Sequence, residues 1–353
     1  MITYPEALVV GLLQGVTELF PVSSLGHSVL IPALIGGRWA RDLNVSATES
    51  PYLAFIVGLH VATAIALIVY FWRDWLRIVR GLISSIRNRR IDNSDERLAW
   101  MIIVATIPVG LAGLVLEHAF RTVLGKPAPA AVFLMINGAI LYGAERLRRR
   151  AEQDATSHRA RAVPITSLGN GTVYASSSVP GTDGEAGTQT AVARPNVYSQ
   201  IAGVPRMQTS HGIGESEENA IESDRRITKR TIKETTLIGA AQILALLPGI
   251  SRSGVTMAAG LRRGLSHEDA ARFSFLLATP VILAAGVLKL PDLTGPLGHG
   301  IGGQVILGSL ASGIGAYAAV RWLTRYFQTR TLTPFAIYCA VAGFLSLAWL
   351  AIR

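Results

Sequence analysis

The stretch LIGAAQILALLPGISRSGVT, residues 237–256, sets an arginine and three hydroxyl side chains behind a Pro-Gly pair in an otherwise apolar run. An apolar run near the N-terminus, residues 6–36, is interrupted in the same way by PVSSLGHS at residues 21–28. Irregular backbone at membrane depth is tolerated only where it is buried in protein or lines a cavity. We therefore predict two re-entrant helical hairpins, at about residues 5–36 and 237–262, each returning to the side of the membrane from which it entered.

The composition indicates that the rest of the chain is also embedded in lipid. Charged residues make up only 16% of the 353 residues, whereas a soluble domain carries about a quarter. Six further apolar windows are long enough, or nearly so, to cross a hydrocarbon core of about 30 Å. They are Tyr52–Trp72, Trp100–Leu116, Ala130–Leu147, Phe273–Leu290, Val305–Ala319 and Pro334–Ile352. We predict an all-α polytopic membrane protein.

The basic residues are unevenly distributed among the connections between these windows. The formal net charge is +10, and arginine and lysine gather at residues 73–97, 146–150, 225–233, 262–263 and 321–330. With two non-crossing hairpins, all these clusters fall on one side, as the positive-inside rule requires of the cytoplasm. Both termini are then predicted outside. The basic balance is a topology signal and does not indicate nucleic-acid binding.

The predicted elements repeat along the chain. One hairpin followed by three crossings occupies residues 1–147 and recurs at residues 237–353, and because three is odd the two copies are inverted in the membrane. Gly11-Leu-Leu-Gln14 before the first break is matched by Gly239-Ala-Ala-Gln242 before the second. Between the repeats lies a predicted cytoplasmic linker, residues 148–236. Its Ser-, Thr- and Gly-rich part, about 151–224, is expected to be disordered because it has too few apolar residues to form a core.

Three positions are expected to have structural roles. Thr3-Tyr-Pro-Glu6 has the pattern of a capping box at the start of the first hairpin. Cys339, the single cysteine, lies in the last apolar window and is expected to be a small core residue. His60, within the first window, is likewise interpreted as a hydrogen-bonded core histidine.

The first hairpin carries the chemistry expected of an active site. Gln14 and Glu18 are four residues apart and share one helix face, and Ser23, Ser24 and His27 follow in the break. A carboxylate at membrane depth is costly and therefore indicates a functional site. Glu18 as a structural hydrogen-bond acceptor is the alternative.

The second hairpin has the residues expected to bind an anion. Arg252 needs an anionic partner at membrane depth, and its planar guanidinium suits phosphate. The hydroxyls of Ser251, Ser253 and Thr256, with the helix N-terminus after the break, would donate to the same anion. A permanent salt bridge between Arg252 and Glu18 is the alternative interpretation.

These two motifs resemble the signatures of the undecaprenyl-diphosphatase family, also called the bacitracin-resistance family. Gln14-x-x-x-Glu18 followed by PVSSLGH at 21–27 resembles the first signature, and PGISRSGVT at 248–256 resembles the second at every fixed position. FIVGLHVATAIALIVYFWRDW and FSFLLATPVIL are also similar to that family's helices. The sequence departs from the usual pattern at the first acidic position of the first motif, which is Gln14 here, a substitution that the family pattern permits, and in its longer linker.

The resemblance implies a multi-pass enzyme of the bacterial plasma membrane that hydrolyses undecaprenyl diphosphate to the monophosphate. This reaction recycles the lipid carrier of cell-wall synthesis and confers bacitracin resistance. Ser24 is then the candidate nucleophile, His27 a proton carrier and Glu18 the group that positions water, nucleophile or a divalent cation. Arg252 is expected to act in binding and catalysis. The predicted diphosphate-binding residues are Gln14, Ser23, Ser251, Arg252, Ser253 and Thr256.

Several points stay open at this stage. Either Ser24 attacks directly or His27 activates a water, and Mg²⁺ or Ca²⁺ bridging Glu18 and the diphosphate is compatible with oxygen ligands. The expected partners are the polyprenyl diphosphate and membrane lipids, with a homodimer left open. Acid-phosphatase-like lipid phosphatases are disfavoured, because their second motif needs a histidine where this chain has Ala258. The serious alternative is a transporter or flippase for a lipid phosphate, because inverted repeats with broken helices are typical of secondary transporters.

Overall fold

The computed structural model describes residues 2–43, 51–162, 166–168, 172–174, 213–289, 291, 295 and 300–352. It divides the chain into two units, Met1–Arg149 with Ile221–Arg353, and Arg150–Ala220. The first unit contains both predicted hairpins and all the predicted spans. About half of the predicted linker lies outside the described residues.

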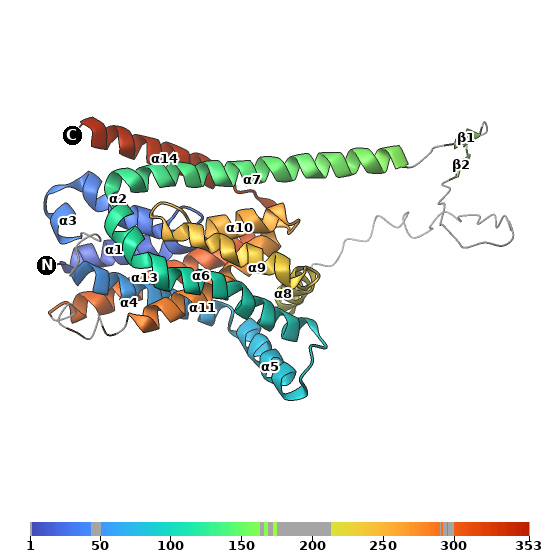
Figure 1. The fold of residues 1–353 in the computed structure, drawn as a ribbon, viewed down its shortest axis with the longest axis horizontal. Helices are drawn as coiled ribbons and strands as arrows, with labels where there is room; N and C mark the ends of the chain where they lie inside the picture. The colour runs from blue at the N-terminus through green and yellow to red at the C-terminus, as the bar shows by residue number, and fades with distance from the viewer. Residues whose placement is uncertain are drawn as a thin grey trace. The chain divides into compact units, whose positions relative to one another are not determined.

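Helices make up most of the described chain (Figure 1). In the N-terminal half they are α1 (Tyr4–Leu19), α2 (Ser24–Ile35), α3 (Gly37–Asp42), α4 (Pro51–Tyr70), α5 (Trp72–Asn88), α6 (Ser94–Leu124) and α7 (Pro127–Ala162). In the C-terminal half they are α8 (Ile213–Thr228), α9 (Ile232–Ala240), the 3-10 helix η2 (Ala241–Leu246), α10 (Arg252–Arg262), α11 (His267–Leu288), α13 (Gly302–Thr329) and α14 (Thr333–Ile352).

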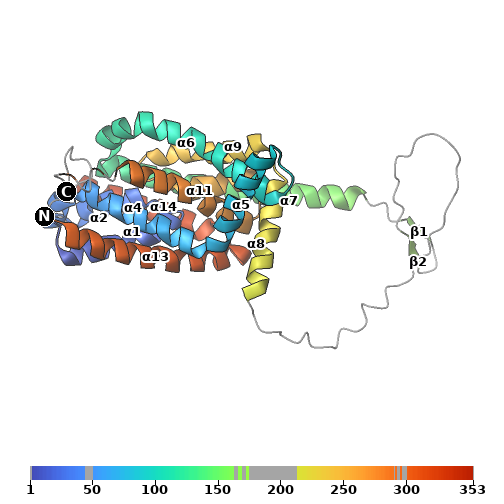
Figure 2. The same ribbon diagram turned by 90° about the horizontal axis from the view of Figure 1, so that it is seen from below.

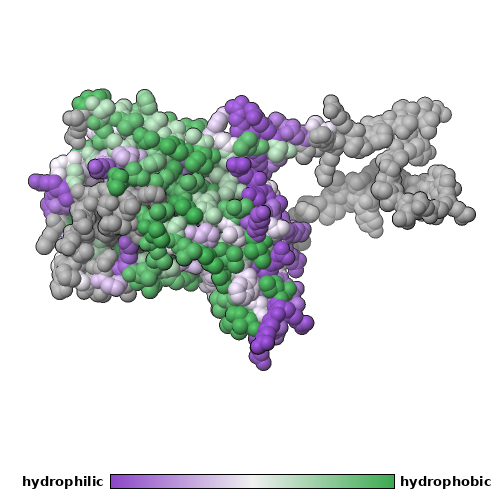
Figure 3. All heavy atoms as spheres, in the orientation of Figure 1, coloured by the Kyte–Doolittle hydropathy of each residue, from purple (hydrophilic) through white to green (hydrophobic). Residues whose placement is uncertain are grey.

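The predicted spans are confirmed as apolar helices. By length and composition, α6, α7, α11, α13 and α14 each contain a segment that can cross a membrane. The remaining window, Tyr52–Trp72, falls on α4. This helix passes the same test together with α5, although the two helices meet at 84°. Hydrophobic residues cover the middle of the face shown in Figure 3, and hydrophilic residues gather at the end where α5 lies. The chain is a polytopic helical membrane protein.

The ends of the first unit are consistent with one polar side carrying the arginines. The start of α1 and the end of α14 lie at the same end of the bundle, away from α5 and α8 (Figures 1 and 2).

The start of α1 has the predicted capping box, in which the Glu6 carboxylate accepts from the backbone N–H and the hydroxyl of Thr3, both at 2.7 Å. Cys339, also as predicted, is fully buried in α14.

The first hairpin is held in the bundle by close contact between α1 and α13. Gly11 and Gly15 on α1 face Gly308 and Ser312 on α13, and a methyl group on Gly15 would collide with the Ser312 carbonyl oxygen. Small residues one helical turn apart allow such backbone approach between helices in membranes. This contact fixes the face of α1 that carries Gln14 and Glu18.

The two breaks have the same local construction. Ser23 caps α2 by accepting from the Gly26 N–H at 3.2 Å, and Ser251 caps α10 by accepting from the Gly254 N–H at 3.2 Å. Because a side-chain oxygen satisfies one of the free N–H groups at each helix start, α2 and α10 begin abruptly after their breaks. Ser24 and Arg252 therefore occupy equivalent positions, the first residue of each helix.

The segment expected to be disordered, about residues 151–224, is helical at both of its ends. α7 continues as far as Ala162, and α8 begins at Ile213, inside the segment expected to be disordered. The described part of the linker also contains a small departure from an all-α chain, because Thr166–Leu168 (β1) pairs antiparallel with Thr172–Tyr174 (β2). The remaining linker residues, 163–165, 169–171 and 175–212, lie outside the described residues.

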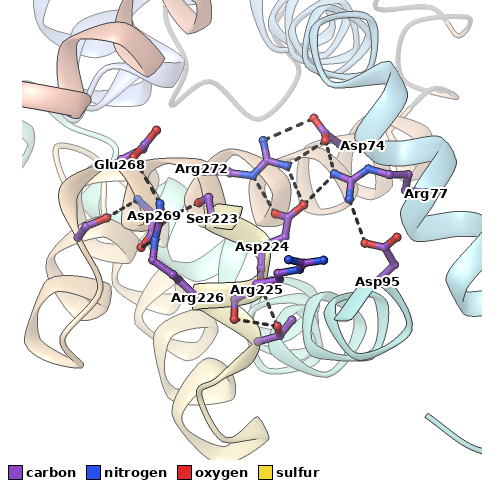
Figure 4. Close-up of polar contacts among 12 residues, drawn as sticks. Asp74, Arg77, Asp95, Ser223, Asp224, Arg225, Arg226, Glu268, Asp269 and Arg272 are labelled. Carbon is purple, nitrogen blue, oxygen red and sulfur yellow. Dashed lines mark hydrogen bonds and ion pairs between the residues drawn. The ribbon is translucent and has the colours of Figure 1, made fainter. Parts of the chain in front are cut away.

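α8 is attached to the bundle by buried ion pairs, which low apolar content alone does not reveal (Figure 4). The Asp224 carboxylate accepts from Nε and Nη2 of Arg272 on α11 at 2.8 and 2.9 Å, and from Nη2 of Arg77 on α5 at 2.9 Å. Asp74 and Asp95 complete the cluster around the two guanidinium groups. These charges fix the segment that leads into the second hairpin.

Asp224→Asn is expected to destabilise the protein by about 3 kcal/mol, because the Asp224 side chain is 1% exposed and its loss leaves buried guanidinium groups without one of their carboxylates. The measurement is the thermal-unfolding midpoint in detergent. Asp92→Asn is the control. Its partner Arg90 is 71% exposed, so the loss should stay below about 1 kcal/mol. Equal shifts for both variants would contradict a structural role for the cluster.

Candidate active site

Glu18 is the centre of a buried polar cluster formed by both hairpins. Its side chain, at the last turn of α1, is 3% exposed. One carboxylate oxygen, Oε2, accepts from the Gln14 amide at 3.0 Å and from the Ser24 hydroxyl, and the other, Oε1, accepts from Nη2 of Arg252. Gln14, Glu18, Ser24 and Arg252, all predicted as site residues, are therefore in direct contact.

The local fold explains why these four side chains meet. Gln14 and Glu18 lie one turn apart on α1, so they face the same way. Ser24 and Arg252 are the first residues of α2 and α10, and the side chains of both contact the Glu18 carboxylate. Helix N-termini carry partial positive charge, so the cluster combines one carboxylate with a guanidinium and two helix ends.

Arg252 keeps donors for a further anion. Its Nη2 contacts Glu18, whereas Nε and Nη1 have no hydrogen-bond partner among the described residues. The side chain is 19% exposed. The ion pair with Glu18 was an alternative interpretation of the sequence, and the contact is present. Because only one of its nitrogens is engaged, Arg252 retains the donors that a phosphate group would need.

His60, interpreted from the sequence as a core histidine, belongs to this cluster. Its Nε2 lies 3.5 Å from Oε2 of Glu18 and 3.3 Å from the Gln14 amide nitrogen. Its Nδ1 lies 2.9 Å from the Ile56 carbonyl oxygen, which only accepts, so Nδ1 carries a proton. The available signal was a histidine in an apolar window, but no motif connected α4 with the hairpins.

His27 lies apart from these contacts. Its Nδ1 is 2.7 Å from the Ser23 carbonyl oxygen and its Nε2 is 2.7 Å from the Tyr338 hydroxyl of α14. The two rings stack with centroids 5.8 Å apart. Among the described residues, His27 makes no hydrogen bond to Ser24 or Glu18. Of these three predicted site residues, only Ser24 and Glu18 are therefore in contact.

The remaining predicted hydroxyls connect the two hairpins. The hydroxyls of Ser251 and Ser253 lie 3.1 Å apart, and each donates to the Phe20 carbonyl oxygen of the first break, at 3.3 and 3.2 Å. Thr256 donates to the Arg252 carbonyl oxygen at 2.7 Å, and Ser23 caps α2. In this arrangement the four hydroxyls hold backbone in place around the site.

Asn137 is a second residue that sequence reasoning missed. It is fully buried on α7, donates to the Pro21 carbonyl oxygen at 3.0 Å and accepts from the Ser251 N–H at 3.0 Å. One side chain therefore satisfies backbone groups of both breaks. An asparagine inside an apolar window was the only signal, and its partners are more than a hundred residues away in the sequence.

The cluster has one carboxylate. Among the described residues no group of three or more His, Cys, Asp or Glu side chains could hold a metal ion. Mg²⁺ bound with a substrate commonly takes one or two protein carboxylates and completes its oxygen ligands from phosphate and water. With Glu18 as the carboxylate of this cluster, a metal ion bound here would take its other oxygen ligands from the substrate phosphates and water.

Fold and site together define a class, a multi-pass membrane protein with a buried carboxylate–arginine–serine cluster between two broken helical segments. The family model described as "Bacitracin resistance protein BacA" matches residues 7–192 and 204–345. The chain belongs to this family, which confirms the resemblance seen in its two motifs.

Individual relatives agree over full length. The chain is 60% identical to "Undecaprenyl-diphosphatase" of Mycolicibacterium paratuberculosis, covering 100% of this chain and 99% of that protein. It is 54% identical to "Undecaprenyl-diphosphatase 1" of Frankia casuarinae, with 97% of each covered. A more distant relative, "Undecaprenyl-diphosphatase" of Granulibacter bethesdensis, is 34% identical over 98% of this chain and 96% of its own.

Proposed function

We propose that this protein hydrolyses undecaprenyl diphosphate to undecaprenyl phosphate and inorganic phosphate in the bacterial plasma membrane. The observation that carries the proposal is the contact of Glu18 with both the Ser24 hydroxyl and the Arg252 guanidinium. A base, a nucleophile and an anion-binding cation are thereby joined in one cluster. The names of full-length relatives at 54–60% identity support the same activity. The product, undecaprenyl phosphate, is the lipid carrier that cell-wall synthesis uses again. This recycling confers resistance to bacitracin.

The contacts of Ser24 support direct attack by its hydroxyl. Oγ forms a bond to the terminal phosphorus while the bond from phosphorus to the bridging oxygen breaks, and the Ser24 proton passes to Glu18. That proton leaves with the lipid monophosphate. A water then attacks the phosphoserine and gives a proton to Glu18 while the bond from phosphorus to Oγ breaks. Glu18 returns this proton to Oγ, so inorganic phosphate is released and Ser24 is restored. Acid quenching with substrate labelled in the terminal phosphate should recover label on Ser24. If Ser24 carries no label and phosphate is released without an initial burst of product, direct attack by water is favoured.

Arg252 would bind the diphosphate and stabilise the charge that develops on it. Its Nε and Nη1 and the N-termini of α2 and α10 supply preorganised donors around the Glu18 cluster. Ser23, Ser251, Ser253 and Thr256 would then hold the two helix starts, and Gln14 would orient the Glu18 carboxylate from 3.0 Å. A divalent cation shared between Glu18 and the diphosphate would neutralise charge on the phosphates.

The two histidines would have different tasks. Because Nδ1 of His60 carries the proton, its Nε2 would accept from the Gln14 amide and hold that amide beside Glu18. His27 contacts the Ser23 backbone and Tyr338 and would position the break from which Ser24 projects. Activation of water by His27 would require it to leave both partners.

We further propose that the membrane arrangement is two inverted repeats, each a re-entrant hairpin and three spans, with the linker in the cytoplasm and both termini outside. Two observations support this arrangement. The start of α1 and the end of α14 lie at the same end of the helix bundle (Figure 2), and the arginines gather in the loops predicted to be cytoplasmic. A tag inserted near Gly187, outside the described residues, should be labelled only after the cytoplasmic side is opened. Labelling in intact cells would refute the arrangement.

The alternative is a carrier that moves a polyprenyl phosphate across the membrane. The inverted hairpins favour it in general terms, and the same cluster would bind the headgroup. Purified protein in detergent micelles separates the two, because transport needs two compartments and hydrolysis does not. We expect release of one inorganic phosphate per undecaprenyl diphosphate in micelles. Binding without phosphate release would reject the phosphatase and favour the carrier.

A further inference from the structure

A groove on the bundle begins beside His27 and runs between α2 and α14. Its volume is about 490 Å³, within the range of small-molecule sites. Apart from His27, Tyr338 and Ser346, its lining residues are apolar, and Leu134 of α7 contributes to it. Leu345 and Trp349 of its α14 wall are 59% and 49% exposed, so the groove is open to the surrounding lipid.

The α2 wall of this groove starts at His27, one helical turn after Ser24. His27, Leu30, Ile31 and Leu34 recur at three- and four-residue spacing and share one helix face. Ser24 precedes His27 by three residues and continues the same face toward Glu18. At 1.5 Å per residue, the face spans about 15 Å from Ser24 to Leu34. The groove therefore begins at His27, one helical turn from the reacting hydroxyl, although Ser24 itself does not line it.

The residues of α14 that line the groove also recur at three- and four-residue spacing, and the first of them, Tyr338, is polar. Tyr338, Ala342, Leu345 and Trp349 share a face of α14, with Tyr338 bonded to His27 at 2.7 Å. The polar end of the groove thus lies on the active-site side, and the apolar part extends from it. A ligand that matches this order has a phosphate headgroup followed by a hydrocarbon chain.

We infer that this groove binds the first isoprenoid units of the polyprenyl chain, next to the diphosphate. The inference rests on the proposed phosphatase activity. Chain binding here would select long-chain substrates over short ones by burying apolar surface. Ala342 and Leu345 are the residues expected to determine this selection.

Ala342→Trp tests the inference, because it narrows the groove from the α14 wall. We expect the KM for undecaprenyl diphosphate to rise at least about tenfold, which corresponds to about 55 Å² of displaced apolar contact. The kcat should stay within about twofold. Val341→Trp is the matched control, since Val341 is the neighbouring residue, is 51% exposed and does not line the groove. Equal effects of the two variants would overturn the inference.

Photo-crosslinking keeps the test independent of turnover and of the folding of Ala342→Trp. A photoreactive amino acid at Leu345 should label undecaprenyl diphosphate, and excess unlabelled undecaprenyl phosphate should compete. The same group at Phe344, which is 60% exposed and does not line the groove, should label poorly. Equal competition by phospholipid would mean that the groove holds a bulk acyl chain, which overturns the inference. If wild-type protein releases no phosphate, the proposed activity fails, yet specific crosslinking would still support the groove.

Discussion

Arg252→Lys is expected to lower kcat for undecaprenyl diphosphate at least about 100-fold at saturating substrate, comparable to the loss of one preorganised oxyanion donor. Lysine keeps the positive charge and can keep the ion pair with Glu18, so the hairpins should stay assembled. It loses the planar fork whose Nε and Nη1 would contact the diphosphate while Nη2 contacts Glu18. The loss should therefore affect kcat as well as KM.

The control lies on the same helix. Arg262 is exposed in the last turn of α10, and Arg262→Lys should leave both constants unchanged. Arg252→Ala is less informative, because it leaves the buried Glu18 carboxylate without its guanidinium and should destabilise the protein by about 3–5 kcal/mol. A normal kcat with only a raised KM for Arg252→Lys would show that Arg252 docks the headgroup without stabilising the transition state. That result would strengthen the carrier alternative.

Glu18→Gln is expected to reduce turnover about 100- to 10,000-fold, the range of a lost general base. The substitution nearly conserves volume and can still accept a hydrogen bond from Arg252, but its amide cannot take the Ser24 proton. Gln14, one turn earlier, is uncharged and cannot replace it. Rates should be measured with protein whose thermal midpoint is close to wild type.

Glu6→Gln is a matched control for this experiment. Glu6 lies on the same helix, is also buried, and within the described part of the chain its carboxylate accepts only from Thr3. Its loss should cost about 1 kcal/mol of capping stability and leave turnover within about twofold. Near-native activity of Glu18→Gln would reduce Glu18 to a structural partner of Arg252.

His60 shows where reading the sequence by motif stops. Both hairpin motifs and the spans were predictable, because apolar length, Pro-Gly breaks and charged residues at membrane depth are local properties of the chain. His60 stands in an apolar helix with no local pattern. Only packing of α4 against α1 brings its Nε2 within 3.5 Å of Glu18.

The linker shows the opposite error. Low apolar content predicted disorder through residue 224, but α8 gains its order from long-range charge pairs, above all Asp224 with Arg272, 48 residues later. Composition measures the core that a segment can build by itself. It does not register a buried guanidinium supplied by another helix.

The sequence by itself determined the membrane class, the spans, both breaks and the pairing of a carboxylate–serine motif with an arginine motif. These follow from solvation, because a bilayer penalises every unpaired polar group and leaves only a few permitted patterns. The tertiary structure decided which polar groups meet. It joined Arg252 to Glu18, brought His60 to their cluster, used Asn137 to bridge the two breaks and turned His27 toward Tyr338. Those contacts depend on how helices from distant parts of the chain pack, and no local spacing encodes them.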